Sequence, residues 1–204
     1  MHTWRVNAPQ ARLDPRQMRT HETVHRAALE VLRREGIGGT TMDAIAAEAG
    51  VARSTLYRNW GSRNEILAAA IDSAAGAPPS LTDGPVIDQL DAVVVGLVSG
   101  LDASEWGRAL PAIVAAIAAE PELAEHYERF TESRRTGALR IVRRGVQQGE
   151  LPADLPLDDF VDALVGPLFY RRLVRGRITT PAWARRHLAR TFVAFGTMNA
   201  ARRS

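Results

Sequence analysis

The chain has 204 residues, of which 46% are hydrophobic and 24% are charged, and its formal net charge is +3. This length allows one large domain or two small ones with a sizeable core, and the small net charge does not by itself indicate a nucleic-acid partner. The absence of cysteine excludes disulfides, thiolate zinc sites and cysteine nucleophiles. The sequence shows neither a signal peptide nor an apolar run of about 18 residues, so we expect a cytoplasmic protein without a membrane span.

Apolar residues recur at helical spacing along the whole chain, which predicts an all-α fold of about nine helices. Residues 1–14 have no such period and are expected to form a flexible N-terminal arm. Asp14 and Pro15 are typical of a helix start, because aspartate caps free amides and proline loses no hydrogen bond there. This first helix should end at the glycines that begin with Gly36. Its core-facing stripe comprises Val24, Ala27, Ala28, Val31 and Leu32.

Two short helices joined by a glycine are predicted next. The second helix covers residues 41–49, and Thr40 has capping-box spacing to Asp43 at its start. Gly50 supplies a tight turn with positive φ before a third helix over residues 52–60.

A fourth helix is predicted after Ser62, whose spacing to Glu65 is that of a capping box. Its apolar face comprises Ile66, Leu67, Ala70 and Ile71. The Gly-Ala-Pro-Pro-Ser sequence at residues 76–80 is the best candidate for a linker. We therefore expect one helical domain over residues 15–75 and a second over residues 85–204.

The second domain is predicted to be a bundle of longer helices. Ser104 is expected to cap one of them and Pro181 to open the last. Pro111 and Pro167 fall inside predicted helices, where proline removes a backbone hydrogen bond and bends the axis. Apolar residues also mark helices at about residues 87–101, 120–149 and 157–174, with heptad-like spacing in the second and Pro167 inside the third.

The predicted third helix has the composition of a surface that contacts nucleic acid. Between Arg53 and Arg63 there are three arginines and no acidic residue. Guanidinium groups pair with phosphates and can bind guanine O6 and N7, while short hydroxyl and amide side chains reach phosphates or base edges. The turn at residues 50–52 has the length typical of a helix-turn-helix. A solvated basic helix at an ordinary helical corner is the alternative explanation.

The sequence from Val24 to Ile71 closely resembles the DNA-binding domain of the tetracycline-repressor (TetR-type) family of bacterial transcriptional regulators. Three positions depart from the family pattern: Ala52 stands where a capping serine is frequent, and Asn59 and Trp60 replace a frequent histidine and phenylalanine. The resemblance depends on several segments taken together: Ala27-Ala28-Leu29, Thr41-Met42-Asp43-Ala44-Ile45-Ala46, Ala49-Gly50-Val51, Thr55-Leu56-Tyr57 and Trp60-Gly61-Ser62-Arg63. Residues 144–154 and 166–171 also resemble one branch of the family.

The resemblance implies a homodimer that binds double-stranded operator DNA, with the third helix in the major groove. Arg53, Ser54 and Thr55 would contact base edges. The remaining predicted contacts would address the phosphate backbone: Thr41, Tyr57, Arg58, Asn59 and Arg63. We expect a repressor that a small apolar effector releases from a palindromic operator, with no enzymatic activity, no cofactor and no metal.

Two sets of residues in the second domain are candidate sites. Aromatic and aliphatic side chains near the proline-bent helices are candidates to line an effector cavity, since kinked helices pack imperfectly. These are Trp106, Leu110, Tyr127, Phe130, Phe169 and Tyr170, for each of which plain core packing is the alternative. By resemblance, the last two helices pair across a two-fold axis. The expected dimer-interface residues are Leu164, Leu168, Phe192 and Phe195.

One further motif competes with this interpretation. His21-Glu22-Thr23-Val24-His25 matches the H-E-x-x-H pattern of zinc proteases, in which both histidines bind the metal and the glutamate acts as base. Glu48 is the only downstream candidate nearby for a third ligand, and Val24 belongs to the predicted core stripe. A zinc metallopeptidase and a non-sequence-specific DNA-binding protein are therefore the alternatives to a sequence-specific regulator.

Overall fold

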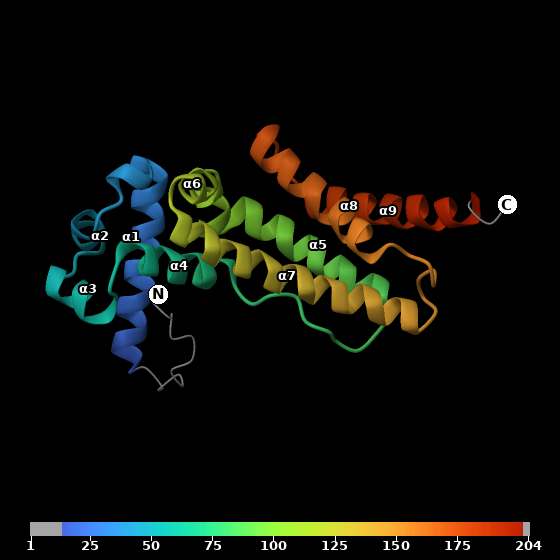
Figure 1. The fold of residues 1–204 in the computed structure, drawn as a ribbon, viewed down its shortest axis with the longest axis horizontal. Coiled ribbons are helices and arrows are strands. Elements are labelled where there is room, and N and C mark those ends of the chain that lie inside the picture. The colour runs from blue at the N-terminus through green and yellow to red at the C-terminus, as the bar shows by residue number, and fades with distance from the viewer. Residues whose placement is uncertain (1–13, 202–204) are drawn as a thin grey trace.

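The computed structural model describes residues 14–201, and over those residues it is helical without a strand, which confirms the predicted all-α fold (Figure 1). The expected arm, apart from Asp14, lies outside the described residues. Among these residues, no helix combines the length and apolarity needed to cross a membrane. The helices are α1 (Pro15–Gly39), α2 (Met42–Ala49), α3 (Arg53–Asn59), α4 (Arg63–Ala75), α5 (Val86–Ala103), α6 (Glu105–Ala119), α7 (Pro121–Gln147), α8 (Leu157–Phe169) and α9 (Pro181–Ala201), with a π-helical turn (Tyr170–Val174) after α8.

The first helix starts at the predicted residue and ends within the predicted run of glycines, at Gly39. Asp14 Oδ1 accepts a hydrogen bond from the Arg16 amide at 3.0 Å, and proline follows the cap. Gly36 has φ of 67°, a left-handed conformation that glycine adopts without strain. It kinks α1 instead of ending it, and one further turn reaches Gly39.

The cap of α2 differs by one residue from the prediction. Thr40 is buried, and its Oγ1 donates to the Gly36 carbonyl at 2.7 Å, across the kink. Thr41 Oγ1 instead accepts from the Ala44 amide at 3.1 Å and so caps α2. The predicted cap at Thr40 is wrong because the kink at Gly36 leaves a carbonyl that the Thr40 hydroxyl satisfies.

The helices pack around one continuous core. α1 packs against both α4 and α6, and α5 packs against α6, α7 and α9. A single cluster of buried apolar side chains runs through these contacts, including Val24 on α1, Leu67 on α4, Leu110 on α6 and Phe160 on α8. Figure 1 shows α2 and α3 at one end of the molecule and the end of α9 at the other.

Proline residues are accommodated inside two helices without ending them. α6 continues through Pro111 and α8 through Pro167. Since Pro167 has no N–H, the Ala163 carbonyl loses the helical donor it would otherwise receive. His187 Nε2 of α9 lies 3.1 Å from that carbonyl oxygen and 3.0 Å from the next one, of Leu164. A side chain of α9 thus satisfies the backbone of α8.

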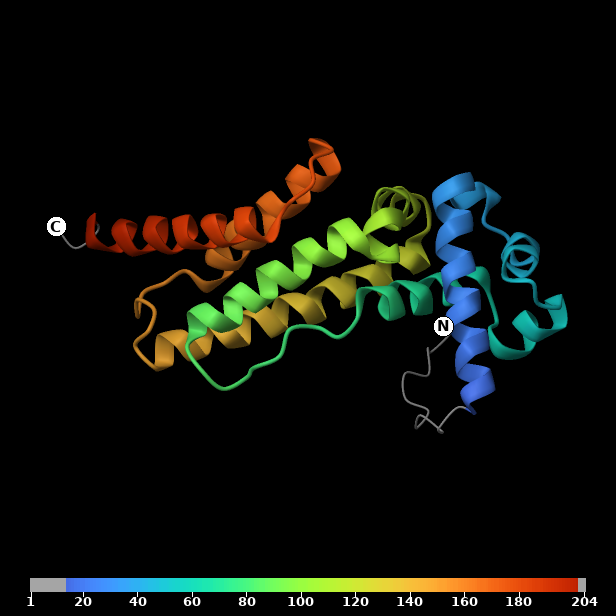
Figure 2. The same cartoon turned by 180° about the vertical axis from the view of Figure 1, so that it is seen from behind.

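The segment between α4 and α5 runs along α7, as Figure 2 shows. Arg134 of α7 donates to the Ala75 carbonyl at 3.0 Å and to the Gly76 carbonyl, at the end of α4. The linker backbone lies close to α7 at Gly137, where an added Cβ would lie 2.2 Å from the Pro79 carbonyl oxygen. Glycine at this position is therefore what allows the linker to lie on the helix.

We predict that Gly137→Ala destabilises the protein by about 1–3 kcal/mol, because the new methyl group overlaps a backbone oxygen and forces the linker away. Thermal or urea unfolding followed by circular dichroism measures this change. Gly96→Ala is the matched control, since the same substitution on α5 meets no atom within 4 Å. It should be neutral or stabilise by about 0.5–1 kcal/mol. Equal stability of the two variants would contradict the close approach at Gly137.

Candidate nucleic-acid interface

The corner between α2 and α3 has the geometry of a helix-turn-helix. Gly50 adopts φ of 65° and ψ of 32°, which confirms the predicted left-handed turn. The Val51 amide donates to the Ala46 carbonyl at 3.1 Å and closes the end of α2. Leu56 of α3 is completely buried. Ala52, the residue before α3, provides no side-chain cap, because alanine has no group that can accept a hydrogen bond. The corner is therefore set by backbone hydrogen bonds and one apolar anchor.

The opposite side of α3 faces solvent. Tyr57 is 61% exposed although its ring is apolar. Thr55 is half-buried, and its carbonyl accepts a hydrogen bond from Asn59 Nδ2 at 2.7 Å. Six of the eight predicted DNA contacts are exposed: Thr41, Arg53, Ser54, Tyr57, Arg58 and Asn59.

An acidic residue that the sequence analysis did not select lies beside the first residue of α3. Arg53 Nε lies 2.6 Å from Asp43 Oδ1, across the helix-turn-helix corner, and both side chains are largely exposed. In water such a pair contributes little to stability. In this structure the pair directs the guanidinium toward α2. A carboxylate ten residues earlier in the chain gives no periodic signal that would have revealed the contact.

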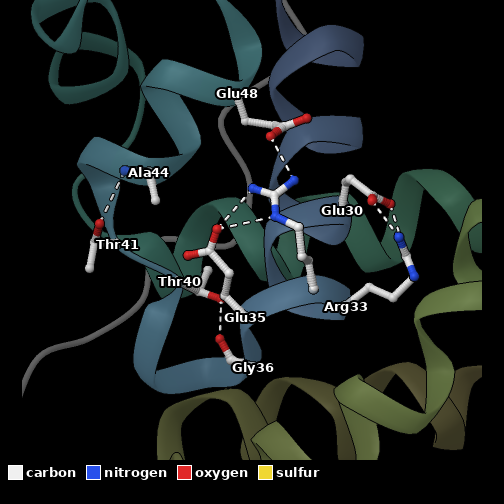
Figure 3. A network of polar contacts seen from close by, with 9 residues as sticks. Glu30, Arg33, Glu35, Gly36, Thr40, Thr41, Ala44 and Glu48 are labelled. Carbon is white, nitrogen blue, oxygen red and sulfur yellow. Dashed lines mark hydrogen bonds and ion pairs between the residues drawn. The ribbon is translucent and has the colours of Figure 1, made fainter.

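A second network fixes α2 against α1, as Figure 3 shows. Arg34 of α1 donates through Nη1 to Glu48 Oε2 at 2.9 Å, and through Nη2 to Glu35 Oε1 at 2.9 Å. Arg33 forms a separate pair with Glu30 on α1. Glu48, the candidate third zinc ligand, is therefore engaged with a guanidinium.

Arg63 does not project from the surface as the resemblance implies. Its Nη1 donates to the Ile37 carbonyl at 2.8 Å and to the Thr40 carbonyl at 3.0 Å. Its Nη2 donates to Glu120 Oε1 at 2.6 Å, at the junction of α6 and α7. In this conformation Arg63 is held against the protein, because the fold brings the Ile37 and Thr40 carbonyls and the Glu120 carboxylate to the start of α4.

The two histidines of the H-E-x-x-H motif pack around an aromatic side chain. The rings of His21 and His25 lie 4.5 Å and 5.9 Å from that of Trp60, measured between centroids. Burial lowers the pKa of His21, and burial together with the nearby His21 lowers the pKa of His25 to about 4. Over the described residues, no group of three or more His, Cys, Asp or Glu side chains is placed to hold a metal ion.

The six effector-site candidates are distributed between the core and the surface. Trp106, Leu110 and Phe130 are buried, and Tyr127 and Phe169 are half-buried. Trp106 contacts Phe169 edge to face, and Tyr127 contacts Phe130. Tyr170, at the start of the π-helical turn, is 54% exposed and does not join them in the core.

Two of the four expected dimer contacts lie inside the protomer. Leu164 and Leu168 are completely buried. Phe192 and Phe195 are half-buried and meet the ring of Phe160 edge to face, at 5.5 Å and 5.3 Å between centroids. Leu164 and Leu168 therefore present no exposed side-chain surface in the single protomer, and their contact with a second protomer stays a prediction.

Family comparisons agree with this geometry. Residues 25–70 match the family described as "Bacterial regulatory proteins, tetR family", and residues 82–191 match "Tetracyclin repressor-like, C-terminal domain". The second match alone spans more than half of the chain, so the chain belongs to the TetR family of helix-turn-helix transcriptional regulators. The proteins of this family are regulators and not enzymes.

Individual relatives share most of the chain. YdeS of Bacillus subtilis (strain 168), described as an uncharacterized HTH-type transcriptional regulator, is 28% identical over 173 residues, which are 84% of this chain and 87% of YdeS. The structure of MexZ, a repressor from Pseudomonas aeruginosa, has a TM-score of 0.65 at 25% identity and covers 87% of this chain and 92% of its own. FadR from Bacillus subtilis, solved with stearoyl-CoA, shares the fold with a TM-score of 0.69 at 17% identity, covering 83% of this chain and 96% of its own.

We predict that His25 makes stability depend on pH. Its folded pKa of about 4 lies below the ordinary 6.5, so between these values the unfolded chain binds a proton that the folded protein does not. Stability therefore falls as the pH drops through this window, by about 1 kcal/mol at pH 5 after allowance for the partly solvated ring.

The variant His25→Phe isolates this effect, since phenylalanine packs against Trp60 and does not titrate. Chemical unfolding at pH 7, 6 and 5 should show its stability rising relative to the natural protein as the pH falls. A constant difference across these pH values would contradict the depressed pKa.

Proposed function

We propose that this protein is a homodimeric repressor that binds a palindromic operator in the bacterial cytoplasm and leaves it when a small apolar effector binds. The observation that carries this proposal is the two-sided character of α3. Leu56 anchors one side in the core, whereas Arg53, Tyr57 and Arg58 lie exposed on the other. A rigidly held polar and basic helix of this kind fits the major groove.

Direct base readout is proposed for the start of α3. Arg53 would bind a guanine through its guanidinium, and Asp43 would hold that group in the required orientation. Ser54 and Thr55 would contact neighbouring base edges or phosphates. The attraction between Arg53 and Asp43 is stronger in the groove, because water is excluded there. A guanidinium that is already oriented also loses less conformational entropy when it binds a base.

Phosphate contacts are proposed for the exposed residues around this helix. Thr41, Tyr57, Arg58 and Asn59 surround the base-reading residues and carry donors that phosphate oxygens accept. Arg63 is left out of this set, because three protein acceptors already hold its guanidinium.

Dimerisation is proposed through the outer faces of α8 and α9. Val193 of α9 is 65% exposed, and the adjacent Phe192 and Phe195 keep part of their rings accessible. A two-fold axis there would place the two copies of α3 about 34–36 Å apart, one turn of the DNA helix. Leu164 and Leu168 would support this face from inside.

The effector is proposed to enter among the aromatic residues between α6, α7 and α8. Trp106 is 5% exposed and its Nε1 is buried without a hydrogen-bond partner. A buried unpaired donor is costly, so an effector that presents an acceptor to it would gain affinity. Such a ligand releases DNA only through its preference for a conformation in which the two α3 helices no longer match the groove.

We predict different effects for two arginines of α3, measured by fluorescence anisotropy on the DNA fragment that the purified protein selects from random sequence. Arg53→Ala should abolish the preference for one base pair in each half-site, a loss of about 1–3 kcal/mol. Arg58→Ala should weaken binding to every sequence alike and lower the salt dependence by about one ion per protomer.

Arg140→Ala on α7 is the charge-matched control, because Arg140 is exposed far along the chain from α3. Its affinity and sequence preference should equal those of the natural protein. Binding of random and selected DNA with the same affinity would instead identify a non-sequence-specific DNA-binding protein. If Arg53→Ala retained the full base preference, the assignment of Arg53 to the groove would be wrong.

A further inference from the structure

The Arg63 side chain joins two parts of the molecule that the proposed mechanism requires to move together. One nitrogen of its guanidinium binds the carbonyl of Ile37, in the last turn of α1, and that of Thr40, which leads from α1 into α2. The other binds Glu120, which is both the C-cap of α6 and the N-cap of α7. The contact therefore runs from the helix-turn-helix to the α6–α7 junction of the bundle.

The environment of this contact makes it stronger than an ordinary surface pair. The Arg63 and Glu120 side chains are 29% and 26% exposed, so solvent screens them only in part. The bond joins charged partners, and hydrogen bonds of this kind are stronger than those between neutral groups. The planar guanidinium also holds its three acceptors in fixed directions, which a single freely rotating donor would not do.

Other polar contacts lie along the same seam between α4 and the start of α7. Asn64 Nδ2 donates to Glu122 Oε2 at 3.1 Å, and His126 Nε2 lies 3.2 Å from Asp72 Oδ1. These contacts hold α4 beside α7. The Arg63 contact differs from them because it continues past α4 into the backbone that precedes α2.

We propose that Glu120 is a positioning residue that sets the angle between the helix-turn-helix and the bundle, and through it the operator spacing that the dimer accepts. This inference rests on the proposed function, because spacing has meaning only for a dimer that reads two half-sites. Each α3 is placed relative to the two-fold axis by the path from α3 through α1 and α4 to the bundle. The Arg63–Glu120 contact is a charged link in this path, beside the packing of α1 and α4 on α6 and α7, and loss of the Glu120 carboxylate removes it.

Removing this contact should lower the selectivity of the dimer for one operator spacing more than it lowers the affinity for DNA. One base pair moves a half-site by about 3.4 Å along the duplex and also rotates it. A dimer whose recognition helices are held at a fixed separation loses affinity for an operator of changed spacing. A dimer in which that separation can vary loses less. Without Glu120 the two helix-turn-helix units still bind DNA, but they discriminate less between the natural spacing and a shifted one.

The test measures dissociation constants of the full-length dimer for the DNA fragment it selects and for the same fragment with one base pair added or removed between the half-sites. We expect Glu120→Gln to lower the ratio of affinities for natural and shifted spacing by at least about fivefold. Arg63→Met should lower the ratio equally, and the double variant should lose nothing more, as expected for two residues acting through one contact.

Glu125→Gln is the matched control, since it removes the same charge from an exposed position in the next turn of α7. Its ratio of affinities for natural and shifted spacing should equal that of the unmodified protein. Glu120→Asp, which keeps the charge but withdraws the carboxylate by one methylene, provides a second variant should Glu120→Gln unfold at the assay temperature, and it carries the same expectation. Circular dichroism melts establish that each variant is folded, so a lower ratio cannot result from unfolded protein.

Two results overturn the proposal. An unchanged ratio for Glu120→Gln shows that the carboxylate does not set the spacing. A loss of affinity on all spacings with Arg63→Met, combined with natural behaviour of Glu120→Gln, assigns Arg63 to a DNA phosphate instead. Failure of the proposed function gives a different pattern, because the unmodified protein itself would then bind every sequence and spacing alike.

Discussion

The packing of α1 against both α4 and α6 is the constraint on which the remaining structure depends. α1 carries the completely buried Val24, Ala28 and Leu32, and these side chains belong to the same core cluster as residues of the bundle. A helix that is shared in this way cannot shift on one side without disturbing the other, since closely packed interiors transmit displacement. The position of the helix-turn-helix therefore depends on how the bundle packs, even though α2 and α3 lie at the far end of the molecule (Figure 1).

Arginine side chains supply much of the long-range polar contact. Arg34, Arg63 and Arg134 each join segments that are distant in sequence, and the chain contains no lysine. A guanidinium presents five N–H donors in one plane, so one side chain can satisfy several carbonyl oxygens at helix ends. The same residue type thus serves two purposes, with some arginines exposed on α3 and others joining one segment of the fold to another.

Local features of this fold could be predicted from the sequence, whereas features that depend on distant neighbours could not. The start at Pro15, the turn at Gly50 and the exposed face of α3 follow from residues within one or two helical turns. The internal role of Arg63 depends on Glu120, which is distant in sequence and close only in the folded chain. Leu164 has the same apolar character whether it faces α9 or a second protomer, so periodicity could not assign its neighbour.

The contact between Pro79 and Gly137 changes how the link between α4 and α5 is understood. Proline and glycine in a linker would ordinarily suggest a tether whose free length lets two units diffuse independently. Here the tether is laid against α7 and bound at its start by Arg134, so little of its contour is free. The linker therefore does not let the helix-turn-helix move independently of the bundle. A displacement of the helix-turn-helix must instead be accompanied by movement of α1 and of the helices that α1 packs against, α4 and α6 among them.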